Sequence, residues 1–293
     1  MLLPEFEFHE PSTLPEACEM LDRFDETASL LAGGTDLLVN MKKRLIRPDH
    51  VISLAKIDHL TDISRESGSL KIGPCVTAAQ LVHSDSIRSI FGALAQGAGV
   101  LGSPLIRNLA TIGGNVVSAR PAADLPPSLM AYGARVVCAS ISGERSIDLN
   151  EFFTGPGKTV MGRSEILTRI EMDIPEGPSG AGYMKLGVRE TLEISLVNVA
   201  AFISLDGENG PIKSARVVLG SVGPTPIRAP SAERVLAGQR PSESVFADAG
   251  AAAARDCTPI DDFRGSAEYR RDMVQVLTKR ALSKALNSAT ADE

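Results

Sequence analysis

The sequence predicts an α+β protein in which a large α/β region is followed by a smaller region of antiparallel strands and helices. Short apolar runs alternate with helical periods through the first half of the 293-residue chain, a pattern typical of α/β organisation. The Gly-Pro-Ser-Gly run at 177–180 indicates a domain boundary. The last third reads as strands followed by helices, the order of an α+β domain. We therefore expect domains at 1–176 and 177–287, and a frayed tail at 288–293.

The first domain is expected to contain two subdomains, at about 1–56 and 57–176. The first reads as a compact βαβ-like unit with Gly33-Gly34 at its first strand-to-helix junction. Its pattern predicts strands at 28–32 and 51–54, and helices at 12–24, capped by Ser12, and at 37–44.

The second subdomain begins with a strand and a helix start signal. Thr77 and Gln80 have the spacing of a capping box. A polar loop leads to a glycine motif at 111–115, and a Pro-rich turn follows at 121–127. The pattern predicts a helix at 87–97 and strands at 69–72, 134–139 and 166–174.

The C-terminal region combines two strands with three helices. The strands are expected at 199–205 and 212–219, joined by a hairpin-type connection at 206–210. The helices are expected at 231–236, 243–255 and 266–286. In the last helix one face is expected to carry Tyr269, Met273, Val276 and Leu277.

Charge and hydropathy exclude two classes of partner. The net charge of −6 and pI near 5.4 argue against nucleic-acid binding, which needs a basic face. The amino terminus has early acids and no long apolar run, so no signal peptide is expected. No stretch approaches the roughly 18 apolar residues of a membrane span. We expect a cytoplasmic protein without a membrane span.

The residues that usually carry metal or hydrolytic chemistry are dispersed. The four cysteines, far apart in sequence, predict buried thiols in a reducing compartment: Cys18, Cys75, Cys138 and Cys257. The four histidines are scattered and lack a nucleophile in a recognisable setting: His9, His50, His59 and His83. Neither a metal centre nor a catalytic residue is expected on this chain. Any enzymatic chemistry would come from a cofactor.

The first glycine motif runs from Ala32 to Leu37. A strand enters it, Gly33-Gly34 permit conformations barred to residues with Cβ, and a helix leaves it. Successive amides in such a turn can bind phosphate oxygens, aided by the helix dipole. Thr35 adds a hydroxyl donor. An ordinary turn capped by Thr35 or Asp36 is the alternative.

The second glycine motif, at 111–115, is expected to be a loop of the same kind. Gly113-Gly114 lie beside Asn115 and Thr111, with Ser118 just beyond. Two such loops suit a cofactor with two phosphates.

Asp124 follows the second motif as an isolated acid in an apolar stretch. Such an acid usually has a hydrogen-bond partner, here a cofactor hydroxyl or a local backbone group.

A third glycine pattern is expected to be unrelated to nucleotide binding. Residues 97–102 match GxGxxG literally, but the fingerprint works only between a strand and a helix. Here a helix precedes it and Ser103-Pro104 follows, so we expect no helix to start there.

The strand at 166–174 carries one misplaced apolar residue. With a period of two, one face holds Ile166, Ile170, Met172 and Ile174. Leu167 then lies on an otherwise charged face, where it could cover a flat ring or pack against a neighbouring loop.

Taken together, these motifs resemble the FAD-binding subunits of the molybdenum hydroxylases, a family that includes xanthine dehydrogenase, carbon monoxide dehydrogenase, nicotinate dehydrogenase and 4-hydroxybenzoyl-CoA reductase. The resemblance covers nearly the whole chain. The segments that carry it are 6–14, 31–37, 106–115, 121–125 and 196–200. It implies a PCMH-type FAD-binding domain of two α/β subdomains and a C-terminal domain like that of the carbon monoxide dehydrogenase flavoprotein.

The resemblance also assigns site residues. Those implied on the pyrophosphate and adenosine side are Leu31, Ala32, Gly33, Gly34, Thr35, Asp36 and Leu37. Those implied at the diphosphate and ribityl region are Thr111, Gly113, Gly114, Asn115 and Ser118. Asp124 would bond cofactor hydroxyls, Leu167 would lie at the flavin ring, and Lys185 would lie near its polar edge.

Two departures qualify these assignments. Glu193-Ile194 stand where relatives often have Asp followed by an aliphatic or aromatic residue, so the flavin contact from this segment is open. Residues 120–124 are uninterrupted and lack cysteine, so we expect no additional iron–sulfur cluster here.

The resemblance implies an electron-transfer subunit of a heteromeric enzyme. A large subunit would hold the molybdenum cofactor, a small one [2Fe-2S] clusters, and the assembly would be a dimer of heterotrimers. FAD here would pass electrons to NAD, a quinone or a carrier protein, from a purine, N-heterocycle, aromatic or aldehyde substrate. The alternatives are a stand-alone flavin oxidase or reductase of the same superfamily, and a non-enzymatic nucleotide-binding module.

Overall fold

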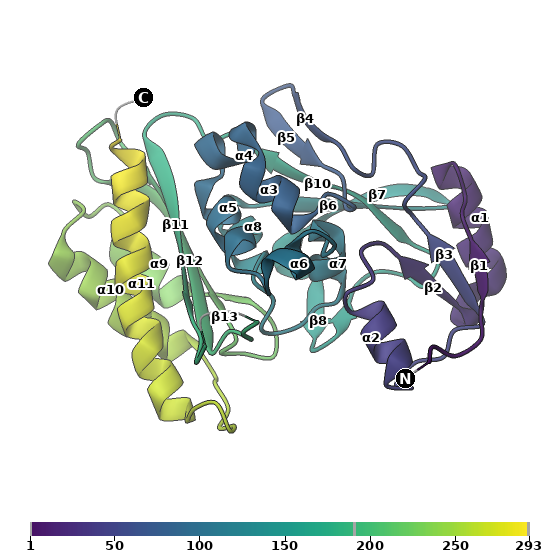
Figure 1. Cartoon of the computed structure of the whole chain (residues 1–293). Coiled ribbons are helices and arrows are strands. Elements are labelled where there is room, and N and C mark those ends of the chain that lie inside the picture. The colour runs from purple at the N-terminus through teal and green to yellow at the C-terminus, as the bar shows by residue number, and fades with distance from the viewer. Residues whose placement is uncertain (1, 190–191, 292–293) are drawn as a thin grey trace.

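The computed structural model describes residues 2–189 and 192–291. It arranges the chain in three blocks (Figure 1): an N-terminal sheet at one end, a central sheet with short helices, and a C-terminal sheet covered by long helices at the other end. The mixed helix and sheet fold expected from the sequence is confirmed. Among the described residues, no helix is both long and apolar enough to cross a membrane.

The N-terminal block is a three-stranded parallel sheet in the order β1-β3-β2. Its strands are β1 (Glu7–His9), β2 (Ala28–Leu31) and β3 (His50–Ser53), and its helices are α1 (Leu14–Phe24), a 3-10 turn (Asp25–Thr27) and α2 (Leu37–Lys42). The cap of α1 is Thr13, whose hydroxyl accepts from the Glu16 amide, and not Ser12 as expected. The Ser12 amide instead donates to the Glu16 carboxylate.

The N-terminal block also corrects one expectation about histidine. His9 and His50 are not scattered, because pairing of β1 with β3 brings their rings within hydrogen-bond distance.

The central block is built on a five-stranded antiparallel sheet in the order β4-β5-β10-β6-β7. Its strands are β4 (Ile63–Glu66), β5 (Ser69–Ile72), β6 (Arg135–Ser140), β7 (Gly143–Asp148) and β10 (Ile166–Asp173), with a small hairpin of β8 (Phe153–Gly155) and β9 (Lys158–Thr159) after a 3-10 turn (Leu149–Glu151). Strands β4 and β7 were not expected. Both are edge strands and carry many polar residues, which weakens the apolar signal.

Six short helices lie in the chain between β5 and β6 and share a hydrophobic core with the central sheet. They are α3 (Ala78–His83), α4 (Asp85–Ile90), α5 (Gly92–Gly99), α6 (Pro104–Arg107), α7 (Ile112–Val117) and α8 (Pro126–Tyr132). The Thr77–Gln80 capping box is confirmed. The single helix expected at 87–97 is wrong, because the chain leaves helical geometry at Phe91 and restarts at Gly92, a weak helix former.

A β-bulge changes the faces of β10. The register against β6 shifts between Leu167 and Arg169, and the inserted Thr168 donates its hydroxyl to the Val137 carbonyl. The extra residue turns Leu167 to the side of Ile170, so it packs in the central core and not on the charged face. Ile166 turns to the other side and packs against the N-terminal block. The face assignment from sequence is therefore wrong for these two residues.

The C-terminal block is a four-stranded antiparallel sheet in the order β11-β12-β13-β14. Its strands are β11 (Ser179–Leu186), β12 (Val197–Leu205), β13 (Ile212–Gly220) and β14 (Ile227–Arg228), and its helices are α9 (Pro230–Leu236), α10 (Glu243–Asp256) and α11 (Ala267–Ala289). The two expected strands and three expected helices are confirmed, whereas β11 was not expected. The structure keeps helical geometry through Ala289, into the tail expected to fray.

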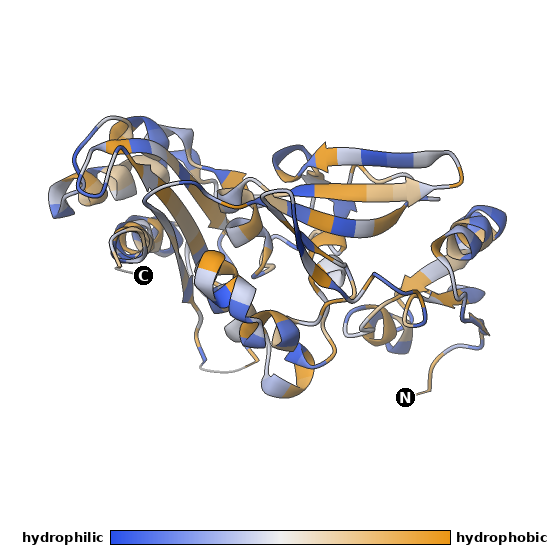
Figure 2. Cartoon of the chain, turned by 90° about the horizontal axis from the view of Figure 1, so that it is seen from above, coloured by the Kyte–Doolittle hydropathy of each residue, from blue (hydrophilic) through white to orange (hydrophobic). Residues whose placement is uncertain are grey.

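Helix α11 runs along β11 and β12 and is buried on one face. That face is defined by Val274, Leu277, Ala281 and Ala285. Tyr269 and Val276 lie off this face, 45% and 36% exposed, so the expected apolar face is wrong for them. Figure 2 shows both hydrophobic and hydrophilic stretches on the strands of the central sheet, and mixed apolar and polar segments on the outer helices.

Gly250 allows α10 to pack closely on α11. A Cβ at this position would lie 2.5 Å from the Gln275 carbonyl oxygen, a backbone atom that cannot rotate away. We expect Gly250→Leu to lower the free energy of unfolding by about 2 kcal/mol or more through overpacking. The matched control is Ala251→Leu, one residue along on the exposed side, which should change it by less than about 0.5 kcal/mol. Urea unfolding measures both, and equal effects would contradict the packing argument.

Candidate functional site

The three blocks enclose one large cleft of about 1540 Å³. Its walls come from the first glycine motif, the second glycine motif, β10 and the loops of the C-terminal block. The expected site residues on its surface are Ala32, Gly33, Gly34, Thr35, Asp36, Leu37, Thr111, Gly113, Gly114, Asn115, Ser118, Asp124 and Leu167. Leu31 and Lys185, the two remaining expected residues, do not line it. Tertiary structure therefore gathers almost the whole predicted set around one space.

The first glycine motif presents backbone donors to the cleft. Gly34 has φ +70°, a conformation that favours glycine, and it turns the chain from β2 into α2. Among the described residues, the amides from Gly33 to Asp36 have no hydrogen-bond acceptor, while Leu38 is the first in the turn to donate back, to Gly34. Consecutive amides without partners in a turn before a helix suit an anionic oxygen.

Gly33 joins the two motifs. A Cβ at Gly33 would lie 1.7 Å from the Leu109 carbonyl oxygen, so only glycine lets the first turn approach the segment before Thr111. Asp36 and Arg120 add an exposed ion pair between the same two regions, 3.7 Å apart. The two motifs therefore form one surface.

The second glycine motif is a helix start and not a loop, which corrects the expectation. Thr111 caps α7 by accepting from the Gly114 amide at 3.1 Å. The amides of Ile112 and Gly113 donate to the carbonyls of Val76 and Pro74. Unlike the first motif, this turn has its backbone donors satisfied within the protein.

The two glycines of this motif have different structural reasons. A Cβ at Gly113 would lie 2.4 Å from the Pro74 Cβ, so Gly113 allows close packing of α7 on the loop after β5. Gly114 is exposed on the cleft, with only the Thr111 hydroxyl near its missing Cβ. Gly114 is the one that leaves room for a ligand.

Asn115 and Ser118 connect α7 to the cleft and to α8. The Asn115 Oδ1 accepts from the Leu125 amide at the start of α8, at 3.2 Å. The Ser118 hydroxyl donates to the Asn115 carbonyl at 3.0 Å. Within the described chain, the Asn115 side-chain nitrogen has no acceptor and can donate toward the cleft.

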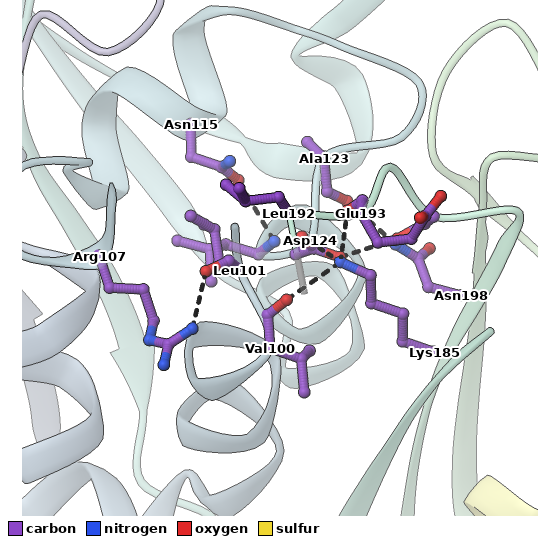
Figure 3. Close-up of polar contacts among 12 residues, drawn as sticks. Val100, Leu101, Arg107, Asn115, Ala123, Asp124, Lys185, Leu192, Glu193 and Asn198 are labelled. Carbon is purple, nitrogen blue, oxygen red and sulfur yellow. Dashed lines mark hydrogen bonds and ion pairs between the residues drawn. The ribbon is translucent and has the colours of Figure 1, made fainter. Parts of the chain in front are cut away.

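Asp124 and Lys185 form a buried ion pair (Figure 3). Nζ lies 2.9 Å from Oδ2, and the side chains are 8% and 9% exposed for Asp124 and Lys185 respectively. The Lys185 ammonium also donates to the carbonyls of Val100 and Glu193, both at 3.1 Å. All three of its N–H groups are thus used.

The other carboxylate oxygen of Asp124 is also satisfied. Oδ1 accepts from the hydroxyls of Tyr183 at 3.0 Å and Ser195 at 2.8 Å. Burial first, and the Asp124 charge second, raise the pKa of Tyr183 well above its ordinary value, so the phenol stays a hydrogen donor. Asn198 completes the group by donating to the Ala123 carbonyl and to Ser195. This network joins β11 and β12 to the segment before α8.

Sequence reasoning missed several residues of the cleft wall. The C-terminal block adds Ser221, Asp262 and Arg270, of which Arg270 is only 2% exposed and bonds to the carbonyls of Leu196 and Ser221. Arg270 Nη2 lies 2.7 Å from Asp262, and hydrogen bonds from Arg264 and Arg270 hold the pKa of Asp262 below its usual range. No local motif marks these residues.

Three further residues of the wall relate to expectations from sequence. Glu193 and Ile194, the pair that departs from the family pattern, both line the cleft, and Ile194 is 57% exposed. Cys75 also lines it, and burial raises the pKa of its thiol to about 11. All four cysteines are buried and free, as predicted.

The GxGxxG pattern at 97–102 is not a nucleotide fingerprint in this fold, although one detail of the prediction is wrong. The short helix α6 does start directly after it, capped by Ser103. The residues before it form helix α5 and not a strand, so the strand-to-helix context is absent. Gly97 instead packs α5 closely against the Asp124 carbonyl, 3.1 Å from its ideal Cβ.

Comparison with known protein families shows which family the chain belongs to. Residues 4–176 match the family described as the FAD binding domain in molybdopterin dehydrogenase. The chain belongs to the FAD-binding subunits of the molybdenum hydroxylases. Residues 182–285 match the C-terminal domain of the carbon monoxide dehydrogenase flavoprotein. The chain is thus a subunit of an oxidoreductase, and FAD is its cofactor.

Relatives of this FAD-binding subunit share its full length. It is 31% identical to the glyceraldehyde dehydrogenase medium chain of Sulfolobus acidocaldarius, over 96% of this chain and 98% of the relative. It is 32% identical to the xanthine dehydrogenase FAD-binding subunit of Escherichia coli O157:H7, over 96% of each. A chain in the solved carbon monoxide dehydrogenase of Hydrogenophaga pseudoflava superposes with a TM-score of 0.94 at 31% identity, covering 98% of this chain and 99% of that one.

The ion pair between Asp124 and Lys185 can be tested by a double-mutant cycle. Removing one partner leaves a buried charge unpaired, so Asp124→Leu and Lys185→Met should each lower the free energy of unfolding by about 3–5 kcal/mol. The double variant should lose much less than the sum of the two. Urea unfolding of the four proteins measures the coupling. Additive losses would show that the pair does not act as a unit.

Proposed function

We propose that the FAD-binding subunit holds one FAD in this cleft and relays electrons through it from a partner subunit to an external acceptor. The observation that carries the proposal is the meeting of the two glycine motifs at Gly33 and Leu109, where four consecutive cleft-lining residues have backbone amides without an acceptor among the described residues. A dinucleotide with two phosphates fits such a surface.

The residues of the cleft fit FAD in a definite order. The amides from Gly33 to Asp36 and the Thr35 hydroxyl would hold the diphosphate, with Ala32 and Leu37 on the adenosine side. Leu31 would act from the end of β2, where its side chain packs near Gly34. Gly114 leaves space for the diphosphate and ribityl chain, and Asn115, Ser118 and Thr111 surround it.

Bound FAD would supply the ability to take up and release electrons. Leu167 and the exposed Ile194 provide apolar surface for a flat ring and exclude water from it. Asp124 and Lys185, proposed at the cofactor hydroxyls and at the polar edge of the ring, already satisfy each other. A direct contact from Lys185 to FAD would exchange one of its three hydrogen bonds.

The proposed role of the chain within a larger enzyme is supported by its relatives. Their names assign them to enzymes of glyceraldehyde, xanthine and carbon monoxide, yet this chain is 31%, 32% and 31% identical to them respectively. The identity is nearly the same to relatives from enzymes of three different substrates. This supports a subunit whose structure does not depend on which substrate the whole enzyme uses. We propose a large subunit with the molybdenum cofactor, a small [2Fe-2S] subunit, a dimer of heterotrimers, and NAD, a quinone or a carrier protein as acceptor. The substrate class is a purine, N-heterocycle, aromatic or aldehyde, and the location is the cytoplasm.

The cofactor site is tested by Gly33→Ala. Its Cβ would overlap the Leu109 carbonyl, so the turn must shift and we expect FAD affinity to fall by about 10-fold or more. The matched control is Gly92→Ala, where a Cβ meets nothing within 4 Å. Flavin released from the purified proteins and quantified by absorbance measures the effect. Full FAD content in Gly33→Ala would overturn the assignment of this turn.

The relay role is tested by comparing the isolated chain with the purified complex. The isolated FAD-loaded chain should show no steady turnover with small organic substrates, while the complex should reduce its flavin when substrate is added. Rapid-scan absorbance of the flavin follows the second reaction. Steady substrate turnover by the isolated chain would favour a stand-alone oxidase or reductase instead.

A further inference from the structure

A cluster of two histidines and one glutamate lies at the edge of the N-terminal sheet away from the cleft. His9 Nε2 and His50 Nδ1 are 3.1 Å apart. The Glu7 carboxylate Oε2 lies 3.3 Å from the His50 nitrogen and 3.8 Å from the His9 nitrogen. Three atoms that commonly bind metals therefore surround one point.

The strand pairing produces this arrangement. Glu7 and His9 are two residues apart in β1, so they lie on one face of the strand, while Phe8 between them is 52% exposed on the other. The parallel register sets Glu7 opposite His50. The cluster thus takes Glu7 and His9 from the three-residue strand β1 and His50, the first residue of β3.

The ring of Phe24 stacks on both imidazole rings of the cluster. Phe24, the last residue of α1, stacks on the His50 ring with centroids 3.9 Å apart and an angle of 16°. It also stacks on the His9 ring at 4.9 Å and 30°. The two histidines are 20% exposed and Glu7 is 73% exposed, so the rings are oriented and an ion can still enter. Such preorganisation lowers the cost of binding.

The three distances match the edges of a coordination tetrahedron. Ligands about 2.0–2.1 Å from a Zn²⁺ ion lie about 3.3 Å from one another, and the observed distances of 3.1, 3.3 and 3.8 Å bracket this value. A hydrogen bond between the two rings would explain only one of the three contacts. A shared cation would serve both nitrogens and the carboxylate.

We propose that Glu7, His9 and His50 bind one divalent transition-metal ion, with Zn²⁺ as the best match and water in the fourth position. Imidazole and carboxylate ligands suit this class of ion. The ion would link the N-terminal strand β1 to β3 through its ligands from both strands. The site is separate from the cofactor cleft, whose surface includes none of the three residues.

Zn²⁺ binding to the full chain tests the proposal. Equilibrium dialysis against ZnCl₂, with bound metal measured by mass spectrometry, should give one ion per chain. Glu7→Gln, His9→Gln and His50→Gln should each weaken binding by more than about 10-fold, since loss of even an outer partner costs that much. His83→Ala, which removes an exposed histidine elsewhere, is the matched control and should not change it.

Two further measurements keep the test decisive. Circular dichroism of each variant shows whether it is folded, and Glu7→Gln is the safest because its side chain is mostly exposed. Co²⁺ substituted for Zn²⁺ should give visible absorption bands that disappear in His9→Gln. Binding that is unchanged in all three folded variants, or that falls equally in His83→Ala, would overturn the proposal.

Discussion

The buried ion pair between Asp124 and Lys185 determines how the C-terminal block meets the rest of the molecule. Burying two charges is costly unless both are paired and hydrogen-bonded. Here every N–H of the ammonium and both carboxylate oxygens have partners. Because those partners come from the residue after α5, the segment before α8, β11 and the 192–195 segment, the network links these elements to one another. The cleft between them takes its shape from that arrangement.

The cleft itself depends on backbone more than on side chains. At the first motif, Gly33 permits contact with Leu109, and Gly34 turns the chain from β2 into α2 with a positive φ. At the second motif, α7 uses its first amides to attach to the loop after β5. One motif thus supplies free donors, and the other supplies a fixed wall and the space at Gly114. This division of roles suits a bound dinucleotide cofactor.

The parallel N-terminal sheet presents different chemistry at the two ends of its strands. The carboxyl end of β2 leads into the glycine turn of the cleft, in agreement with the usual position of ligand sites in such sheets. The amino ends of β1 and β3, at the other end of the strands, carry Glu7 and His50. Since β1 and β3 pair over only three positions, a bound ion there would reinforce a short contact near the start of the chain.

The sequence by itself determined the features that have a local physical cause. The Thr77 capping box, the three helices of the C-terminal block and the two glycine motifs follow from residues close together in the chain. Only the tertiary structure decided what depends on distant partners. Asp124 meets Lys185 across 61 positions, Gly113 is explained by Pro74, and His9 meets His50 across two paired strands. The bulge at Thr168 likewise depends on β6, and it alone turns Leu167 into the core, because register is a property of two strands and not of one.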